Sequence, residues 1–244
     1  MLDVDLGGAC ARFTDRAGGV STGAYASLNL GPWTDDVPED VAENRRRLAD
    51  ATGAMLAQGH QVHGTTVARV TDRPWPEAAG AAGAGIAGGR PAAADGQATC
   101  LEGVAPIVLT ADCVPVVVAG AGAVAALHAG WRGLAGGVLA AGVQAVRELG
   151  TNGAPLRAAV GPSAGPCCYE VGEEVAARFD ARFRRGTGAA THLDLPAAAA
   201  AALRDAGVEH VELVGLCTIC DERFFSHRRD GGVTGRQAGL GWLT

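Results

Sequence analysis

An apolar run from Leu109 to Gly133 contains three side chains whose chemistry does not suit a buried strand. Asp112 and Cys113 stand near its start and His128 near its end. The run is typical of two buried strands with a turn between them. If the two strands pair as a hairpin about the sequence AGAGA, Cys113 and His128 fall at the end remote from that turn, within reach of one metal ion.

His63, in the sequence QVHG, is the leading candidate for a third ligand, because the following Gly64 allows a close backbone approach. Two histidines and one cysteine with an open fourth position form a catalytic zinc arrangement. The alternative is that His128 is a hydrogen-bonded core histidine. No short-range CxxC or HExxH pattern links these three residues.

Two further side chains are candidates for a role beside this trio. His60 faces the opposite side of a strand from His63, which favours contact with substrate or with a ligand residue rather than with the metal. Asp112 is expected to orient a histidine or to accept a proton, and the alternative is a carboxylate that forms a turn or an ion pair.

Arginines in two glycine-containing segments are candidates for anion binding. Arg132 lies in GWRG just ahead of an expected helix, where free backbone N–H groups suit a phosphate. Its alternative is a surface ion pair. Arg228, Arg229 and Arg236 lie among turn glycines in a segment that is either a solvated tail or a lid.

The seven cysteines are odd in number and no export signal precedes them, so most are expected to be reduced thiols. Cys167 and Cys168 lie with Ser163 in a Gly/Pro loop before an expected helix, a place where a thiol pKa is often lowered. Cys217 and Cys220 form a CxxC pattern, but without a second CxxC it gives only weak support to a redox or structural zinc site.

The surrounding pattern predicts an α/β protein with a mixed sheet. Helices are expected at 40–53, 133–150 and 195–206, and one is expected to begin near Glu170. Strands are expected within 60–70, 105–120, 123–130 and 210–218 and after residue 156, and the chain ends in a polar tail at 221–244. A Gly/Ala/Pro segment at about 77–94 is expected to be a flexible connection.

Composition limits the class of protein. The chain has 244 residues, 48% hydrophobic and 19% charged, with a formal net charge of −6. These values indicate a folded globular protein and argue against nucleic acid or an anionic membrane as a partner. An N-terminus with acidic residues in place of a basic leader favours a cytoplasmic location. A GxGxxG match at 83–88 falls inside the Gly/Ala/Pro segment expected to be a connection, and no P-loop motif is present, so neither a dinucleotide fold nor a P-loop is supported.

Several motifs together resemble the YfiH-like family, also called the laccase-domain or polyphenol oxidase family. They are GVSTGAYASLNLG (19–31), QVHG (61–64), ADG (94–96), TADCVPVVV (110–118), ALHAGWRG (126–133), GPSAGPCCYEVGEEV (161–175) and FFSHRRDGGVTGRQA (224–238). The resemblance covers nearly the whole chain. It implies one domain, 1–244, with a four-layer α/β/β/α sandwich (α+β) fold.

The resemblance also implies a purine nucleoside phosphorylase whose zinc is held by His63, Cys113 and His128. The implied reaction converts adenosine, inosine or methylthioadenosine with phosphate to the base and ribose 1-phosphate, with adenosine deamination as a second activity. Some relatives are linked instead to peptidoglycan editing. We expect Asn29 and Gln61, within the shared motifs, to bind substrate. Phosphate is expected at Arg132 or at tail arginines such as Arg228, and proton transfer at His60 or Asp112.

The family's laccase name raises a copper alternative, which the sequence disfavours. A blue-copper site commonly adds an axial Met, and the only methionines are Met1 and Met55. The six histidines form no HxH pair of the kind a multicopper cluster uses. Copper binding to the same trio in vitro stays open, because Cu²⁺ outcompetes Zn²⁺ at most such sites.

Two alternatives of other classes also remain. One is a metal-independent Cys/His amidohydrolase with Cys113 as nucleophile and His128 as base. The other is a binding protein for nucleotides or cell-wall fragments. We expect a monomer or weak homodimer.

Overall fold

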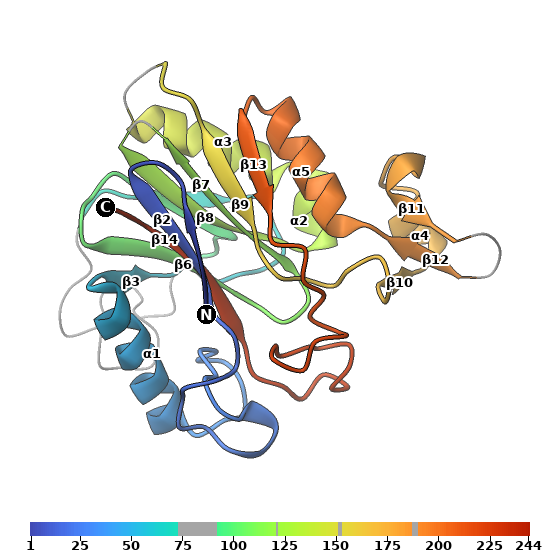
Figure 1. The fold of residues 1–244 in the computed structure, drawn as a ribbon, viewed down its shortest axis with the longest axis horizontal. Helices are drawn as coiled ribbons and strands as arrows, with labels where there is room; N and C mark the ends of the chain where they lie inside the picture. The colour runs from blue at the N-terminus through green and yellow to red at the C-terminus, as the bar shows by residue number, and fades with distance from the viewer. Residues whose placement is uncertain (73–91, 121, 151–152, 187–189) are drawn as a thin grey trace.

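Two large sheets stack face to face, with helices on both outer faces (Figure 1). The computed structural model describes residues 1–244 except 73–91, 121, 151–152 and 187–189. Most of the connection expected at about 77–94 therefore lies outside the described residues. None of the described helices is long and apolar enough to cross a membrane.

The first sheet has five strands in the order β1-β2-β14-β6-β3, and only the β3–β6 pair is parallel. Its strands are β1 (Leu2–Asp5), β2 (Ala9–Phe13), β14 (Gln237–Leu243), β6 (Val104–Thr110) and β3 (Met55–Ala57). Helix α1 (Pro38–Thr52) covers its outer face, where Leu48 packs among the side chains of Ile107 and Leu240.

The second sheet has six strands in the order β13-β9-β7-β8-β5-β4 and is also mixed. Its strands are β13 (His210–Leu213), β9 (Arg157–Val160), β7 (Val114–Gly120), β8 (Ala123–Ala129), β5 (Gly96–Thr99) and β4 (Val67–Val70). Helices α3 (Val138–Leu149) and α5 (Leu195–Asp205) cover its outer face. The layers are therefore α/β/β/α, and the predicted mixed α/β class is confirmed.

A smaller third sheet projects from the body (Figure 1). It contains β10 (Glu170–Val171), β12 (Thr191–Leu193) and β11 (Arg184–Arg185), with the short helix α4 (Glu173–Ala176) and the 3-10 helix η3 (Ala181–Phe183) beside it. The helix expected to begin near Glu170 is wrong at its start, because Glu170 and Val171 pair with β12.

The β7–β8 hairpin is confirmed, with Val114 opposite Ala129 and Gly120 opposite Ala123. Alternate residues of β7 enter two different cores: Val116 packs toward the helices and Val117 toward the other sheet. Both faces of the strand are buried, which explains its continuous apolar sequence. The apolar run before it splits, however, because Thr110 ends β6 in the first sheet and Val114 begins β7 in the second.

The predicted polar tail at 221–244 is wrong at its end, where β14 occupies the centre of the first sheet. The glycines of β14 interrupt the alternating apolar pattern that would predict a strand, and packing between the two sheets explains why they are glycines. A Cβ on Gly239 would lie 2.6 Å from Pro115 Cβ, and one on Gly241 would lie 2.6 Å from Val117 Cγ1. Glycine therefore lets the two sheets approach closely at β14.

Three other element predictions need correction. The segment 60–70 is a strand only at β4, and His60 makes an isolated bridge to Ala93. The helix predicted at 133–150 is divided into α2 (Trp131–Gly136) and α3, because Gly137 adopts φ 96° between them. The strand predicted at 210–218 ends at Leu213.

Candidate metal centre

His63, Cys113 and His128 come together from three different segments. Their potential ligand atoms all lie within 4.8 Å of one another. Cys113 Sγ lies 3.9 Å from His63 Nε2, and the two imidazole rings are 4.8 Å apart in an edge-on arrangement. These are separations that one ion, bound at about 2.0–2.3 Å from each ligand, can bridge after small side-chain movements.

Cys113 and His128 occupy their positions because of the hairpin. His128 pairs with Pro115 near the open end of β7–β8, and Cys113 directly precedes β7. Gly130 then allows His63 to close the group, because a Cβ there would lie 2.9 Å from His63 Cδ2 and 3.2 Å from Cys113 Sγ. The arrangement therefore has no room for a side chain at position 130.

His63 lies on a loop that wraps around the carboxylate of Asp95. The backbone N–H groups of Val62, His63 and Gly64 donate to Asp95 at 3.1, 2.8 and 2.7 Å. His63 itself has φ 60°, a conformation that costs free energy for a non-glycine residue. Consecutive N–H groups directed at one anion offset that cost and fix the loop.

Asp95 also orients His128. Its Oδ1 lies 2.8 Å from His128 Nδ1, and both side chains are buried. With Nδ1 occupied by the carboxylate, Nε2 is the nitrogen left to bind a metal. Asp95 belongs to the motif ADG, and the sequence alone indicates no role for it. Asp95, and not Asp112, is therefore the acid that orients a histidine of the trio, which corrects the expectation placed on Asp112.

The pKa values of these groups are strongly perturbed. Burial alone would raise the pKa of Asp95, but the hydrogen bonds from His128 and from the backbone outweigh burial and lower it to about 2. Burial would also raise the pKa of Cys113, and the neighbouring His128 and His63 lower it instead, to about 6. The pKa of His128 rises against the effect of burial because Cys113 and Asp95 stabilise its charged form. Without metal, the group favours a thiolate beside an imidazolium.

The carboxylate of Asp112 is bound to the C-terminal segment, so it is not placed for the proton transfer that was one expectation for it. It accepts hydrogen bonds from the Thr218 hydroxyl at 2.6 Å, the Ser226 hydroxyl at 3.1 Å and the Arg228 backbone N–H at 2.7 Å. Like His63 it has a positive φ, 88°. Asp112 therefore anchors the segment 218–228 against the loop that carries Cys113.

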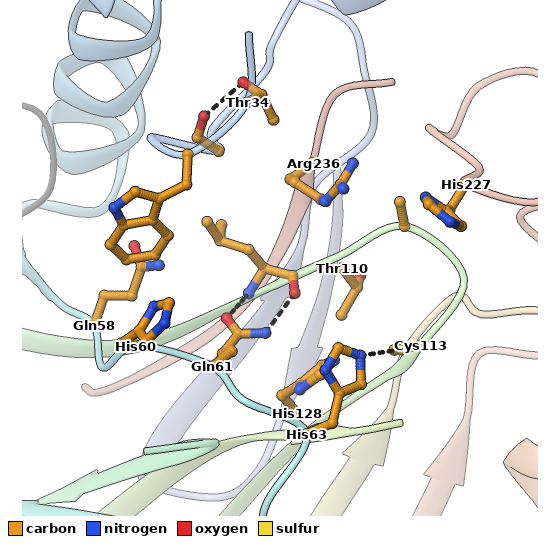
Figure 2. A pocket seen from close by; sticks show the side chains of 14 residues that line it. Thr34, Gln58, His60, Gln61, His63, Thr110, Cys113, His128, His227 and Arg236 are labelled. Atoms are coloured by element: carbon orange, nitrogen blue, oxygen red, sulfur yellow. Dashed lines mark hydrogen bonds between the residues drawn. The ribbon is translucent and has the colours of Figure 1, made fainter. Parts of the chain in front are cut away.

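A cavity of about 370 Å³ opens beside the trio. Figure 2 shows His63, Cys113 and His128 on one side of it, with His60 and Gln58 across from them. The volume is within the range of small-molecule sites. Its lining residues are Gly31, Trp33, Thr34, Gln58, His60, Gln61, His63, Leu109, Thr110, Ala111, Cys113, His128, His227 and Arg236.

Three buried polar atoms in this lining have no hydrogen-bond partner among the described residues: Gln58 Nε2, His60 Nδ1 and Thr110 Oγ1. Leaving such atoms unpaired is costly unless a ligand or water satisfies them. His60 and His63 line the same cavity, so the expectation that they face opposite sides is wrong. The reason is that residues 61–66 form a loop and not a strand.

Arg236 is the arginine that lines the cavity. Its backbone N–H donates to Asn29 Oδ1 at 2.8 Å, and burial lowers its pKa from the usual arginine value. Asn29 uses its full hydrogen-bonding capacity, since Oδ1 also accepts from Gly31 and its NH₂ donates to Thr34 and Asp36. Asn29 thus positions Arg236 and the loop at 31–36, and it is not among the described residues that line the cavity.

The other predicted binding residues are dispersed. Gln61 lines the cavity, but its amide both donates to and accepts from the backbone of Leu109 at 2.8 Å. Arg132 is exposed and stacks on Trp131, with 4.3 Å between the guanidinium carbon and the ring centroid. Arg228 donates to the Glu170 carbonyl at 3.0 Å. Neither Arg132 nor Arg228 is among the described residues that line the cavity.

Fold and site together define a mixed α/β protein with a candidate metal-binding trio at the edge of a polar cavity. A family model described as multi-copper polyphenol oxidoreductase laccase matches residues 10–244, and the chain belongs to this family. The resemblance to YfiH-like proteins is thereby confirmed.

Similar proteins cover almost the whole chain. A purine nucleoside phosphorylase of Corynebacterium glutamicum is 39% identical over 240 residues, which are 95% of this chain and 93% of that protein. One from Deinococcus radiodurans is 41% identical, over 92% of this chain and 85% of its own.

Solved structures agree. A Neisseria meningitidis protein of the DUF152 family has a TM-score of 0.84 and 38% identity, covering 99% of this chain and 98% of its own. The hypothetical protein YfiH of Bacillus licheniformis has a TM-score of 0.87 and 31% identity, covering 97% and 93%.

Proposed function

We propose that this chain is a zinc-dependent purine nucleoside phosphorylase acting on adenosine, inosine and methylthioadenosine. The observation that carries the proposal is the trio of His63, Cys113 and His128 at the edge of a cavity with unpaired polar atoms. Relatives that match nearly the full chain are named purine nucleoside phosphorylase, which supports both the enzyme class and the substrate class.

The donor set fits zinc. Two imidazoles and one thiolate leave a fourth position open for a small molecule, as in catalytic zinc sites. The carboxylate of Asp95 behind His128 supplies the outer hydrogen bond that metal-bound histidines usually have. A bound zinc ion would supply Lewis acidity, including for the attack of water on C6 of adenosine in the proposed second activity.

In phosphorolysis the bond between ribose C1′ and the purine nitrogen breaks, and a bond from C1′ to a phosphate oxygen forms. The developing charges require a cation for the phosphate and a proton for the departing purine. Arg236 is the cavity arginine and is assigned to phosphate, in preference to Arg132 and Arg228. His60 lines the cavity with Nδ1 unpaired and is assigned to the purine proton, since Asp112 is occupied elsewhere.

The test is to incubate the purified protein with adenosine, with and without phosphate, and to identify the products by mass. Adenine and ribose 1-phosphate are expected only when phosphate is present, and inosine in either case. Arg236→Met should raise KM for phosphate with less effect on deamination. Release of adenine at an equal rate without phosphate, or no reaction with any of the three nucleosides, would overturn the proposal.

The thiolate and imidazolium favoured at Cys113 and His128 also suit a metal-independent hydrolase of amide bonds. Metal analysis separates the two candidates. Purified protein with about one zinc in the trio, inactivated by a chelator and restored by Zn²⁺ better than by Cu²⁺, supports the phosphorylase. Full activity in metal-free protein, lost on alkylation of Cys113, supports the hydrolase.

A further inference from the structure

Four cysteines outside the candidate centre gather from two loops that are about 50 residues apart in the chain. Cys167 and Cys168 lie on the loop between β9 and β10, and Cys217 and Cys220 follow β13. Their sulfur atoms all lie within 4.8 Å of one another. The sequence has no second CxxC to accompany Cys217 and Cys220, but the fold brings the adjacent pair Cys167 and Cys168 beside them.

The separations between sulfurs suit four ligands around one ion. Cys168 Sγ and Cys167 Sγ lie 2.9 and 3.4 Å from Cys220 Sγ. A tetrahedron of zinc–sulfur bonds of about 2.3 Å places its sulfurs roughly 3.8 Å apart. That spacing is longer than the 2.9 Å pair and falls inside the 4.8 Å within which all four sulfurs lie. A disulfide would account for only two of the four thiols and requires sulfurs about 2.05 Å apart.

The two loops are held in place by their own backbones. Ser163 N–H donates to the Leu216 carbonyl at 3.2 Å, and Thr218 N–H donates to the Ser163 carbonyl at 3.0 Å. Each loop also makes a tight turn, with Cys168 N–H bonded to Gly165 O and Asp221 N–H to Cys217 O. The cluster is therefore a consequence of paired backbones and not of chance side-chain rotamers.

Gly165 fits the cluster closely. Its N–H donates to Cys217 Sγ at 3.3 Å, as expected for a thiolate, which accepts hydrogen bonds. A Cβ on Gly165 would lie 3.1 Å from Cys217 Cβ, which is tighter than an ordinary contact. The guanidinium of Arg229, paired with the Asp230 carboxylate, donates to the Thr218 carbonyl at 2.8 Å and so ties the loop of Cys217 and Cys220 to the C-terminal segment.

We propose that Cys167, Cys168, Cys217 and Cys220 bind a structural zinc ion that joins the two loops. Four thiolates leave no open position, so the site is closed and holds the fold in place without taking part in catalysis. The same loop carries Thr218, whose hydroxyl donates to Asp112 beside Cys113. The zinc therefore also stabilises the loop of Thr218, which through Asp112 holds the loop that carries Cys113 of the candidate metal-binding trio.

The experiment counts zinc per chain in protein purified under reducing conditions. Wild type is expected to hold two equivalents, the double variant Cys217→Ser/Cys220→Ser one, and the double variant His63→Ala/Cys113→Ser one. Cys100→Ser, which removes an exposed thiol outside both groups, should keep two. If only the trio fails to bind, wild type holds one equivalent and Cys217→Ser/Cys220→Ser holds none, so this outcome overturns the first metal assignment and still supports the second.

A measurement on wild-type protein guards against misfolding of the variants. Alkylation followed by peptide mapping should show Cys167, Cys168, Cys217 and Cys220 protected by bound zinc and exposed by a chelator, with Cys100 labelled equally in both states. Cobalt loading of His63→Ala/Cys113→Ser should give strong thiolate-to-metal absorption. Equal zinc content in wild type and Cys217→Ser/Cys220→Ser, labelling that zinc does not change, or a Cys168–Cys220 disulfide in anaerobically purified protein would overturn the proposal.

Discussion

Asp95 connects two ligands of the candidate centre, because one carboxylate receives both the His63 loop and His128. Asp95→Asn keeps the side-chain volume but puts a neutral amide where His128 Nδ1 needs an anionic acceptor. We expect zinc affinity to fall about 10–100-fold, the usual effect of losing a carboxylate behind a metal-bound histidine.

Competition with a chromophoric zinc chelator measures that affinity, with Asp3→Asn, which breaks a surface ion pair with Arg12, as the control. Because the four-cysteine site adds a second zinc, the titration is done in the Cys217→Ser/Cys220→Ser background. An unchanged affinity in Asp95→Asn would show that Asp95 does not support the trio.

Cys113 gives a pH prediction for the metal-free protein. Its pKa is lowered to about 6, so the thiolate is present above that pH and is lost as the pH falls through 6. Alkylation of Cys113 should therefore be half-maximal near pH 6, well below the value of about 8.5 for an ordinary cysteine. His128→Ala removes the imidazolium that stabilises the thiolate and should move the midpoint upward.

Peptide-resolved alkylation with iodoacetamide measures this midpoint, and saturating Zn²⁺ should suppress labelling. A midpoint at the ordinary cysteine value in wild type, or one that His128→Ala leaves in place, would contradict the electrostatic account.

At the level of residues, the sequence alone predicts those candidate site residues that stand out from their immediate neighbours. Cys113 and His128 are out of place in an apolar run, and that anomaly is visible without a structure. Asp95 is different, because its role depends on the N–H groups of a loop more than 30 residues earlier. Asn29 was predicted to touch substrate, but its partners come from the Gly31–Asp36 loop and from Arg236 near the other end of the chain.

Among the elements, the turn from β8 into α2 limits how closely the trio can gather. Gly130 has φ −66°, which alanine also adopts, so Gly130→Ala adds a methyl group without backbone strain. That methyl would press on His63 and Cys113. We expect at least a tenfold loss of zinc affinity with a melting temperature that changes little.

Gly136→Ala, at the end of the same helix, is the matched control, because its added methyl meets only the Thr65 side chain. Affinity is measured by chelator competition, again in the Cys217→Ser/Cys220→Ser background, and folding by circular dichroism. If both variants weaken zinc binding to the same extent, the close approach at Gly130 is not the cause.

The elements that were predicted correctly carry strong local signals. Helix α1 ends at a left-handed Gly53, and β7 and β8 are each a continuous run rich in Val and Ala. The failures occur where tertiary packing decides. The loop at 61–66 resembles a strand in composition but is bent around Asp95, and the four cysteines meet only because two loops pair through Ser163 and Cys217.

At the scale of the whole molecule, β14 is the strand on which we expect folding to depend most, because it lies at the centre of the first sheet. Deleting 237–244 would remove β14 and leave β2 and β6 without a common neighbour. We expect this truncation to abolish folding, seen as aggregation and loss of thermal cooperativity. Deleting residues 1–5 removes only the edge strand β1 and should leave a cooperative, less stable protein. A truncation at 236 that still melts cooperatively would contradict this expectation.

Four properties of the whole molecule remain predictions: a single domain over 1–244, a monomer or weak homodimer, a cytoplasmic location, and the absence of nucleic acid and membrane partners. The two stacked sheets share a core between β2 and β7–β8, which is consistent with the first of these.

The position of β14 also has a consequence for biosynthesis. Arg236 and β14 are translated after all the other described helices and strands, yet Arg236 lines the cavity and β14 completes the first sheet. A nascent chain can form the β7–β8 hairpin early, but it cannot close that sheet or complete the cavity until Arg236 and β14 have left the ribosome. Incomplete translation products are therefore expected to expose unpaired strand edges and to be cleared by proteases.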